Sequence, residues 1–266
     1  MEHGPLSTDY SYIDIHAHLD AYEPEVRADV LARMREHATG AITIGTDPAS
    51  SRQAVEIAHH EDAVAACVGV HPDHATGTDL HELATLAADP GVVAIGECGF
   101  DYFRVGRSEV RKLQQGVFEH QIALALEHAK PLMLHLRPSP GSTDAYDDAL
   151  DLLEQYARAH GEALTGNAHF FAGSLEHARR FLDIGFTLSF TGVITFTHDY
   201  DEVVRFLPQD MIHAETDSPF VTPVPHRGTQ NEPSYVRYVV EQLAVIRGED
   251  PEELGRALVD NARRCF

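Results

Sequence analysis

Two histidines stand two residues apart near the start of the chain, in the run Ile13-Asp14-Ile15-His16-Ala17-His18. The apolar residues at 13 and 15 predict a short β-strand, and residues two apart on a strand point to the same side. His16 and His18 can therefore aim their imidazoles at one point, which is half of a metal site. The chain contains 18 histidines, so this pair could also be incidental, and the interpretation depends on further ligands.

Further candidate ligands follow apolar runs elsewhere in the chain. Imidazole and carboxylate are ligands for divalent ions of the zinc, manganese and magnesium type, and no thiolate is required. A central carboxylate such as Glu97 could bridge two ions about 3.5–4 Å apart, and such a pair activates water for hydrolysis. The residues of this kind that stand at or just after a strand-like segment are His71, Glu97, His135, His169 and Asp217.

The elements that must position these residues alternate along the chain. Strands are predicted around 13–15 and at 41–46, 63–70, 91–96, 131–135, 163–171, 186–190 and 211–215. Helices are predicted at 23–37, 48–60, 78–88, 108–128, 144–158, 174–182, 200–207, 233–246 and from 250 onward. Eight strands alternating with helices favour a TIM-like (β/α)8 barrel over an open sheet. The site of such a barrel lies at the C-terminal ends of its strands, where the candidate ligands fall.

The length of 266 residues suits one barrel domain at 12–266, preceded by a flexible tail at 1–11 that contains Gly4-Pro5. The hydrophobic fraction of 43% is ordinary for a soluble protein. No apolar run approaches the ~18 residues of a membrane span, and the N-terminus lacks the pattern of a signal peptide. We therefore expect a cytoplasmic protein with no membrane partner, and a monomer is favoured.

Three cysteines, Cys67, Cys98 and Cys265, are too few and too scattered for a disulfide framework or a Cys-x-x-Cys zinc site. We expect them to fill space in the core or at the surface. Cys98 directly follows Glu97, so on a strand its side chain would face away from that of Glu97.

The formal net charge is −22, and Lys112 and Lys130 are the only lysines. This acidic composition is typical of proteins from salt-rich cytosols, although a high-GC genome would explain the preference for arginine equally well. An acidic surface repels nucleic acid at low ionic strength, whereas at ~1 M salt the Debye length is only ~3 Å. Acidity therefore makes a nucleic-acid substrate less expected without excluding it.

A series of short motifs runs in order through nearly the whole chain. They are His16-x-His18, Gly69-Val70-His71-Pro72, Gly96-Glu97-x-Gly99-Phe100-Asp101-Tyr102, Gln114 with Phe118 and Gln121, His135-x-Arg137, His169-Phe170-Phe171-Ala172-Gly173, Glu215-Thr216-Asp217-Ser218-Pro219 and Arg227-Gly228-x-x-Asn231-Glu232-Pro233. Each motif alone is weak, but together the sequence resembles the TatD family of metal-dependent hydrolases in the amidohydrolase superfamily. Two features depart from the family: a longer link at 138–143 and the strong negative charge.

The resemblance implies two divalent ions, of Mg, Mn or Zn. One would be held by His16, His18, Glu97 and Asp217, and the second by Glu97, His135 and His169. Asp217 would also orient or deprotonate the attacking water, so Asp217 and Glu97 are the expected catalytic residues.

Four further residues are candidates for binding the substrate's phosphate: His71 and Arg137, and with less support Arg227 and Asn231. Each has a structural alternative of nearly equal weight. Arg227 could pair with Glu215 or Asp101, and Asn231 could cap the following helix. We expect Gln114, Phe118 and Gln121, on one helix face, to pack the barrel wall.

Three functions compete at this point. The resemblance favours a deoxyribonuclease, an exonuclease or an enzyme that incises damaged DNA, with single-stranded or damaged DNA or a small phosphoester as substrate. The same kind of centre in related barrels hydrolyses lactones, amides or the ester of a D-aminoacyl-tRNA. A purely structural metal is the third alternative, although the ligands outnumber those that a closed four-coordinate zinc site uses.

Overall fold

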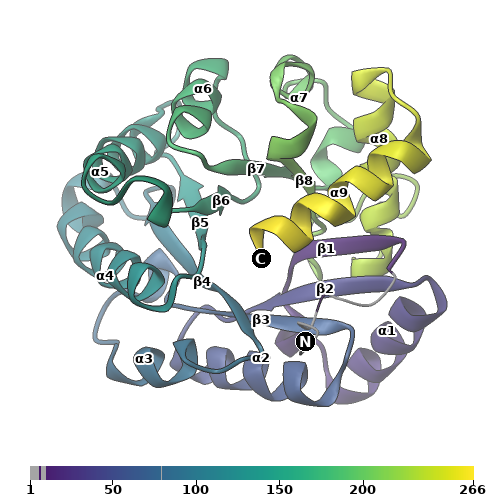
Figure 1. Ribbon diagram of the computed structural model, residues 1–266, viewed down its shortest axis with the longest axis horizontal. Coiled ribbons are helices and arrows are strands. Elements are labelled where there is room, and N and C mark those ends of the chain that lie inside the picture. The colour runs from purple at the N-terminus through teal and green to yellow at the C-terminus, as the bar shows by residue number, and fades with distance from the viewer. Residues whose placement is uncertain (1–5, 7–9, 79) are drawn as a thin grey trace.

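Eight parallel strands form one sheet in the computed structural model, which describes residue 6 and residues 10–78 and 80–266. The strands are β1 (Tyr12–Ala17), β2 (Thr39–Ile44), β3 (Val64–Val68), β4 (Val92–Asp101), β5 (Leu132–Arg137), β6 (Gly166–Ala168), β7 (Thr187–Phe190) and β8 (Ile212–Ala214), and they pair in chain order. Figure 1 looks down this barrel, with the helices in a ring outside the strands. The sheet is a TIM-type barrel, which confirms the predicted fold class.

The helices follow the strands in alternation. They are α1 (Pro24–Glu36), α2 (Pro48–His60), α3 (His81–Ala87), α4 (Arg107–His128), α5 (Asp144–His160), α6 (Leu175–Asp183), α7 (Asp201–Phe206), α8 (Val236–Arg247) and α9 (Pro251–Cys265). Short 3₁₀ turns sit in the connections, among them η1 (Leu19–Ala21), η2 (Pro72–His74), η4 (Gly192–Thr195) and η6 (Pro233–Tyr235).

Local sequence signals fix several helix ends. The Asp47 side chain accepts a 2.8 Å hydrogen bond from the Ser50 amide, with Pro48 at the first helical position of α2. Gly248 ends α8 in the left-handed conformation, with φ of 69°. These signals explain why the predicted bounds of α2 and α8 lie close to the observed ones.

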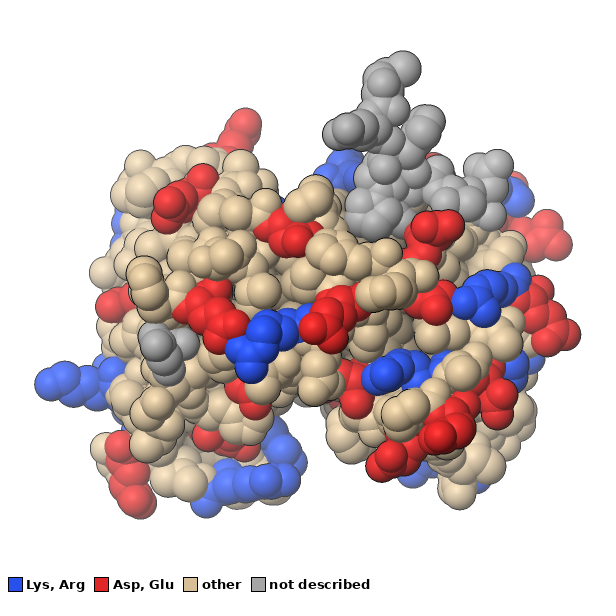
Figure 2. All heavy atoms as spheres, turned by 90° about the horizontal axis from the view of Figure 1, so that it is seen from below, with Lys and Arg blue, Asp and Glu red and all other residues tan. Residues whose placement is uncertain are grey.

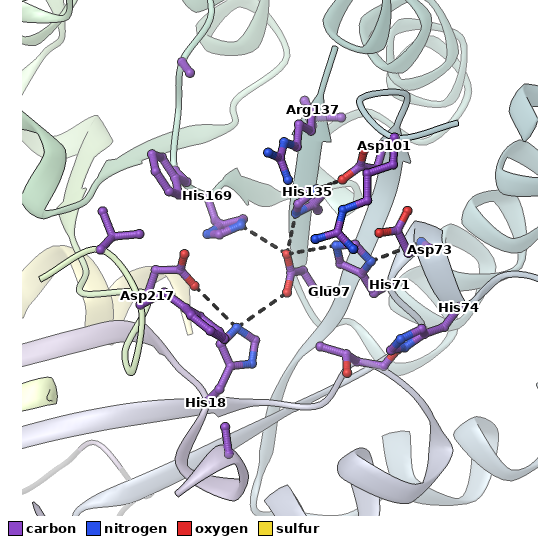
Figure 3. Close-up of a pocket in the computed structure, with 18 of the residues that line it drawn as sticks. His18, His71, Asp73, His74, Glu97, Asp101, His135, Arg137, His169 and Asp217 are labelled. Atoms are coloured by element: carbon purple, nitrogen blue, oxygen red, sulfur yellow. Dashed lines mark hydrogen bonds and ion pairs between the residues drawn. The ribbon is translucent and has the colours of Figure 1, made fainter. Parts of the chain in front are cut away.

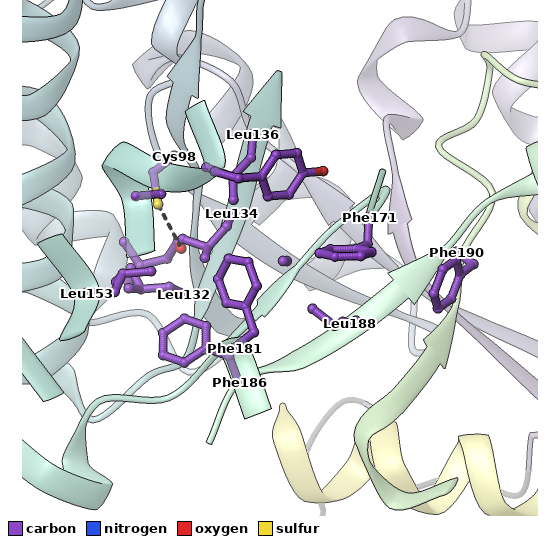
Figure 4. Close-up of a cluster of buried hydrophobic side chains, with 14 of the residues drawn as sticks. Cys98, Leu132, Leu134, Leu136, Leu153, Phe171, Phe181, Phe186, Leu188 and Phe190 are labelled. Carbon is purple, nitrogen blue, oxygen red and sulfur yellow. Dashed lines mark hydrogen bonds between the residues drawn. The ribbon is translucent and has the colours of Figure 1, made fainter. Parts of the chain in front are cut away.

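Apolar side chains fill the layer between the strands and the outer helices. Figure 4 shows part of this cluster, where Phe181 of α6 and Leu153 of α5 meet Leu134 and Leu188 on β5 and β7. Cys98 is buried in the same layer, so it faces away from Glu97 as predicted. Cys67, Cys98 and Cys265 are free cysteines.

The barrel closes just beyond β8 rather than within it. Ala17 and Ser218 form a parallel bridge. The His18 amide donates a 2.7 Å hydrogen bond to the carbonyl oxygen of Ser218, and the Asp217 amide donates a 2.9 Å bond to that of His16. The first and last strands are therefore joined at the C-terminal rim of the barrel.

Two strands differ most in length from their predictions. β4 was expected to end at 96 but continues to Asp101, because β5 pairs alongside it and because Gln114 bonds both the amide and the carbonyl of Asp101, at 3.1 and 2.9 Å. Glu97 therefore lies within a strand rather than after its end. β6 was expected at 163–171 but is limited to Gly166–Ala168 by a 3₁₀ turn before it (Gly161–Ala163) and a turn after it.

The face of α4 that carries Gln114, Phe118 and Gln121 packs the barrel wall, as predicted. Phe118 is fully buried. Gln121 accepts a 2.9 Å bond from the Val70 amide and donates a 3.0 Å bond to the Val70 carbonyl. The two glutamines thus clamp the strand ends that carry His71 and Glu97.

The predicted tail falls mainly on residues 1–5 and 7–9, which lie outside the described residues. Within it, Leu6 is buried and Tyr10 donates a 3.0 Å hydrogen bond to the carbonyl of Asp62. The division at residue 12 stays a prediction.

Candidate metal centre

Glu97 lies at the centre of the site, and its two carboxylate oxygens face different imidazoles. Oε2 is 3.6 Å from Nε2 of His16 and 3.9 Å from Nε2 of His18. Oε1 is 2.6 Å from Nδ1 of His135 and 3.1 Å from Nε2 of His169. Figure 3 shows His18, His135 and His169 pointing toward Glu97, with His135 on β5 and with His18 and His169 just after the ends of β1 and β6. The Glu97 carboxylate thus lies between two pairs of candidate ligands, His16 with His18 and His135 with His169.

Asp217 completes the first of these pairs. Its Oδ1 is 3.4 Å from Nε2 of His18 and 3.9 Å from Nε2 of His16. Asp217 has a φ of 55°, a conformation that non-glycine residues seldom adopt and that is concentrated at functional sites. The structure therefore brings together all six residues that the sequence suggested as ligands.

The chemistry of this donor set fits divalent cations. Neither ring nitrogen of His16 has a hydrogen-bond partner among the described residues, although the side chain is fully buried. The His16 ring stacks on that of His169, with centroids 3.7 Å apart. A buried imidazole without a partner is costly, and a bound ion would satisfy it. Ligand atoms of His16, His18 and Glu97 lie within 4.8 Å of one another, as do those of His71, Glu97 and His135.

A second layer of groups orients the imidazoles. The Ile44 carbonyl lies 3.3 Å from Nδ1 of His18, which leaves Nε2 free to bind an ion. Asp101 Oδ2 lies 3.1 Å from Nε2 of His135. Glu215 Oε1 lies 3.3 Å from Nδ1 of His169. Such partners fix the tautomer and direction of a ligating histidine.

Sequence reasoning assigned no role in the centre to three carboxylates that the structure places there: Asp14, Asp101 and Glu215. Glu215 is fully buried and accepts bonds from the Phe170 amide, at 2.6 Å, and from the Ser189 hydroxyl, at 2.8 Å. Asp14 Oδ1 accepts from the amides of His16, at 3.2 Å, and Thr216, at 2.9 Å. A carboxylate between Ile13 and Ile15 of a buried strand was the available signal for Asp14, because such a residue must find partners.

Electrostatics set the protonation of the central groups. Burial alone would raise the pKa of Glu97, but the charge of His169 and the hydrogen bond from His135 hold it well below its usual range. Glu97 is therefore ionised at neutral pH, the form that binds a cation. Burial, reinforced by the charge of His135, lowers the pKa of His71 to about 3. His71 is therefore a neutral imidazole.

The centre opens into a cavity of about 770 Å³ at the C-terminal rim of the barrel. Its lining combines apolar side chains with ionisable ones, which include His71, Arg104 and Arg137 as well as His18, Glu97, His135, His169 and Asp217. His71 Nε2 is 3.9 Å from Oε1 of Glu97, and its Nδ1 accepts a 3.1 Å bond from the Asp73 amide. In the neutral ring Nε2 then carries the proton and can donate into the cavity.

Arg227 and Asn231 do not line this cavity. Arg227 lies over the Phe196 ring at 4.2 Å and donates to the Thr222 carbonyl at 2.9 Å, in place of the suggested Glu215 or Asp101. Asn231 is buried and does not cap the next helix.

The Asn231 side chain donates instead to the carbonyls of Thr216, at 2.9 Å, and Phe220, at 2.5 Å. Asn231 thereby holds the loop that carries Asp217.

The fold and this centre define a metal-dependent hydrolase of the amidohydrolase type. Residues 13–266 match the family model described as TatD related DNase. The chain is 37% identical over 260 residues to the "uncharacterized metal-dependent hydrolase YabD" of Bacillus subtilis, covering 95% of this chain and 98% of that protein. The "3'-5' ssDNA/RNA exonuclease TatD" of Erwinia billingiae is 34% identical over 241 residues, with 86% and 87% covered.

Solved structures agree with the sequence comparison. The TatD homologue YJJV of Escherichia coli K12 aligns with a TM-score of 0.84 at 26% identity, covering 96% of this chain and 98% of that one. An amidohydrolase from Saccharomyces cerevisiae shares the fold, with a TM-score of 0.80 at 18% identity and coverage of 97% and 100%. The chain belongs to the TatD family of metal-dependent hydrolases.

Within the described part of the chain, no helix combines the length and the apolar character that a membrane crossing requires. The predicted cytoplasmic location, the salt-rich cytosol and the monomer stay predictions, since no feature of the structure tests them.

Proposed function

We propose that this hydrolase cleaves phosphodiester bonds in single-stranded or damaged DNA, as an exonuclease or as an enzyme that incises damaged sites. The observation that carries the proposal is the position of the Glu97 carboxylate, whose two oxygens face separate pairs of imidazoles. The cavity above it is lined by two arginines, Arg104 and Arg137. The nuclease named among the relatives supports the same class of substrate.

The site is proposed to hold two divalent ions of Mg, Mn or Zn. His16, His18 and Asp217 would hold one, His135 and His169 the other, and Glu97 would bridge them. When bound, such ions lower the pKa of a water molecule and stabilise the charge on a phosphoryl oxygen and a leaving group. The three second-layer contacts then keep the imidazoles of His18, His135 and His169 directed at their ions.

Asp217 is proposed as the general base. Burial would raise the pKa of Asp217, but the hydrogen bond from His18 and the charges of His16 and His169 lower it, so the carboxylate is ionised. Its Oδ1 faces the same point as Nε2 of His18 and Oε2 of Glu97. A water held there lies within reach of Asp217, which can accept its proton.

His71 and Arg137 are proposed to bind the scissile phosphate. His71 offers the Nε2–H proton, and Arg137 is an always-charged donor in the cavity wall. Hydrolysis of a lactone, an amide or a D-aminoacyl-tRNA ester is the alternative, and a lactone or amide site would be expected to be closed and apolar. The anion-binding side chains in the wall of this cavity, His71, Arg104 and Arg137, favour the phosphodiester.

The proposal is tested with purified protein, a labelled single-stranded oligonucleotide and added Mg²⁺, Mn²⁺ or Zn²⁺. We expect metal-dependent shortening that Asp217→Ala and His135→Ala reduce at least 1,000-fold, in the range that removal of a key catalytic group causes, about 10³ or more. His59→Ala is the matched control, because His59 is an exposed histidine paired with Asp89 outside the site. Undiminished cleavage by Asp217→Ala would reject the proposal and indicate a contaminating nuclease.

A further inference from the structure

Exposed apolar side chains gather around the mouth of the cavity. Among the described residues, five of the nine large exposed apolar side chains belong to the three segments that follow β4, β7 and β8: Phe103, Val105, Phe196, Phe220 and Val224. Phe220 is the most exposed of the three phenylalanines, at 57%, followed by Phe103 at 47% and Phe196 at 46%. Exposed aromatic rings beside an active site indicate a binding surface.

Phe220 is fixed at the edge of the metal centre. It lines the cavity, and its ring centroid lies 6.1 Å from that of His18. The Phe220 amide donates a 2.9 Å bond to the Asp217 carbonyl, and its own carbonyl accepts from Asn231. The backbone that positions the proposed general base therefore also positions this ring.

Phe103 lies beside the cavity as part of a pair with Arg137. The Arg137 guanidinium lies over the Phe103 ring at 3.9 Å, and Arg137 itself lines the cavity. The Asp101 side chain accepts a 2.9 Å bond from the Phe103 amide, which fixes the start of this loop. The pair presents a flat surface of ring and guanidinium next to the place where Arg137 would meet a phosphate.

The charges of the cavity wall do not favour a polyanion by themselves. Two arginines line it, Arg104 and Arg137, against the carboxylates of Asp20, Asp73, Glu97, Asp101 and Asp217. On the side of the molecule formed by α1, α2 and α3, acidic and basic side chains are interspersed (Figure 2). With a net charge of −22, the chain has little long-range attraction for a phosphate backbone. The affinity for the rest of a strand must therefore come from another interaction.

We infer that Phe220 and the Phe103–Arg137 pair are stacking platforms for unpaired nucleobases, one on each side of the scissile phosphate. The inference rests on the proposed function and adds how the strand is held. Every base has a flat aromatic face, so stacking tolerates any sequence but requires bases that are free of a duplex. The substrate is thus a single-stranded end, held by its bases more than by its phosphates.

Binding of a labelled oligothymidylate with phosphorothioate linkages, measured by fluorescence anisotropy with Mg²⁺, tests this inference. We expect Phe220→Leu and Phe103→Leu each to raise Kd about 10-fold, within the range for loss of one base–aromatic stack. Phe220→Tyr and Phe103→Tyr keep a ring and should restore the affinity. Phe206→Leu is the matched control, because Phe206 is also an exposed phenylalanine beneath an arginine, Arg179, but does not line the cavity.

An oligonucleotide of the same length with abasic residues separates stacking from a structural effect. Wild-type protein should bind it at least about 10-fold more weakly than the thymine strand. In Phe220→Leu the ratio of the two Kd values, abasic strand over thymine strand, should fall toward one. Because only two arginines, Arg104 and Arg137, line the cavity, about two phosphates can be neutralised there. The affinity of the wild type for the thymine strand should therefore fall less than about 10-fold between 50 and 200 mM salt.

Equal affinity of the wild type for thymine and abasic strands would overturn the inference, as would a Leu variant that binds as tightly as the Tyr variant. The proposed function would still stand if the wild type cleaved both strands. A wild type that neither binds nor cleaves any oligonucleotide with metal would instead overturn the proposed function itself.

Discussion

The backbone amide of Asp217 donates a 2.9 Å hydrogen bond to the carbonyl oxygen of His16, across 201 positions of the chain. This bond belongs to the closure of the barrel, and it also sets the late carboxylate beside the early histidine pair. Barrel closure and assembly of the metal centre are therefore the same structural event. Changes that loosen the closure should weaken metal binding without touching a ligand.

Asp14 offers a test of that link, because it accepts hydrogen bonds from the His16 and Thr216 amides, and from the Thr216 hydroxyl at 2.5 Å. Asp14→Ala should lower the affinity for one of the two ions about 10- to 100-fold, the usual effect of losing an orienting partner of a ligand. Isothermal titration of the metal-free protein with Zn²⁺ measures this. Two unchanged affinities would show that Asp14 does not orient the ligands.

Metal binding should stabilise the folded chain, since the ligands converge only in the closed barrel. An ion at 100 times its Kd adds about 2.7 kcal/mol to the free energy of unfolding. We expect Tm to rise by roughly 5 °C or more on adding Mn²⁺ or Zn²⁺ after chelation. Glu97→Gln, which weakens the bridging ligand, should lose most of this rise. A full rise in Glu97→Gln would place the ions elsewhere.

Arg137 should contribute to catalysis through the phosphate of the substrate. Losing a hydrogen bond to a charged group costs about 1.5–3 kcal/mol, so Arg137→Leu should lower kcat/KM for a labelled oligonucleotide about 10- to 100-fold. Steady-state cleavage assays measure the change. Arg179→Leu removes an arginine that also lies over a phenylalanine, but outside the cavity, and should cleave like the wild type. Equal losses in both variants would argue against a specific role of Arg137.

His213, on β8, gives a prediction for stability against pH. Burial lowers the pKa of its imidazole to about 3, and neither ring nitrogen has a partner among the described residues. The unfolded chain takes up a proton near pH 6.5 while the folded chain does not, so stability falls as pH drops from about 6.5 toward 3.

His213→Leu removes this titration. The free energy of unfolding of the variant should therefore rise relative to that of the wild type as the pH falls. Over the 1.5 pH units from 6.5 to 5, the difference in unfolding free energy should widen by about 2 kcal/mol, at about 1.4 kcal/mol per unit. Urea denaturation at pH 7.5 and pH 5 measures it. A difference that stays constant between the two would contradict the assignment.

The order of elements could be predicted from the sequence because it depends on local signals. Apolar runs of strand length, and helix starts such as Asp47-Pro48, mark the alternation that a parallel barrel requires. The positions of His16, His18 and Asp217 after such runs were also visible. Residues at the C-terminal ends of parallel strands meet at one rim, so these residues could be expected to meet.

Only the tertiary structure decided how the groups face one another. It directed one oxygen of Glu97 to His16 and the other to His135, extended β4 past Glu97, and left Arg227 and Asn231 out of the cavity lining. These outcomes depend on strand register and on contacts between segments far apart in sequence, and periodicity carries no information about either. The sequence by itself thus determined which residues could bind metal, whereas closure of the barrel decided which atoms meet.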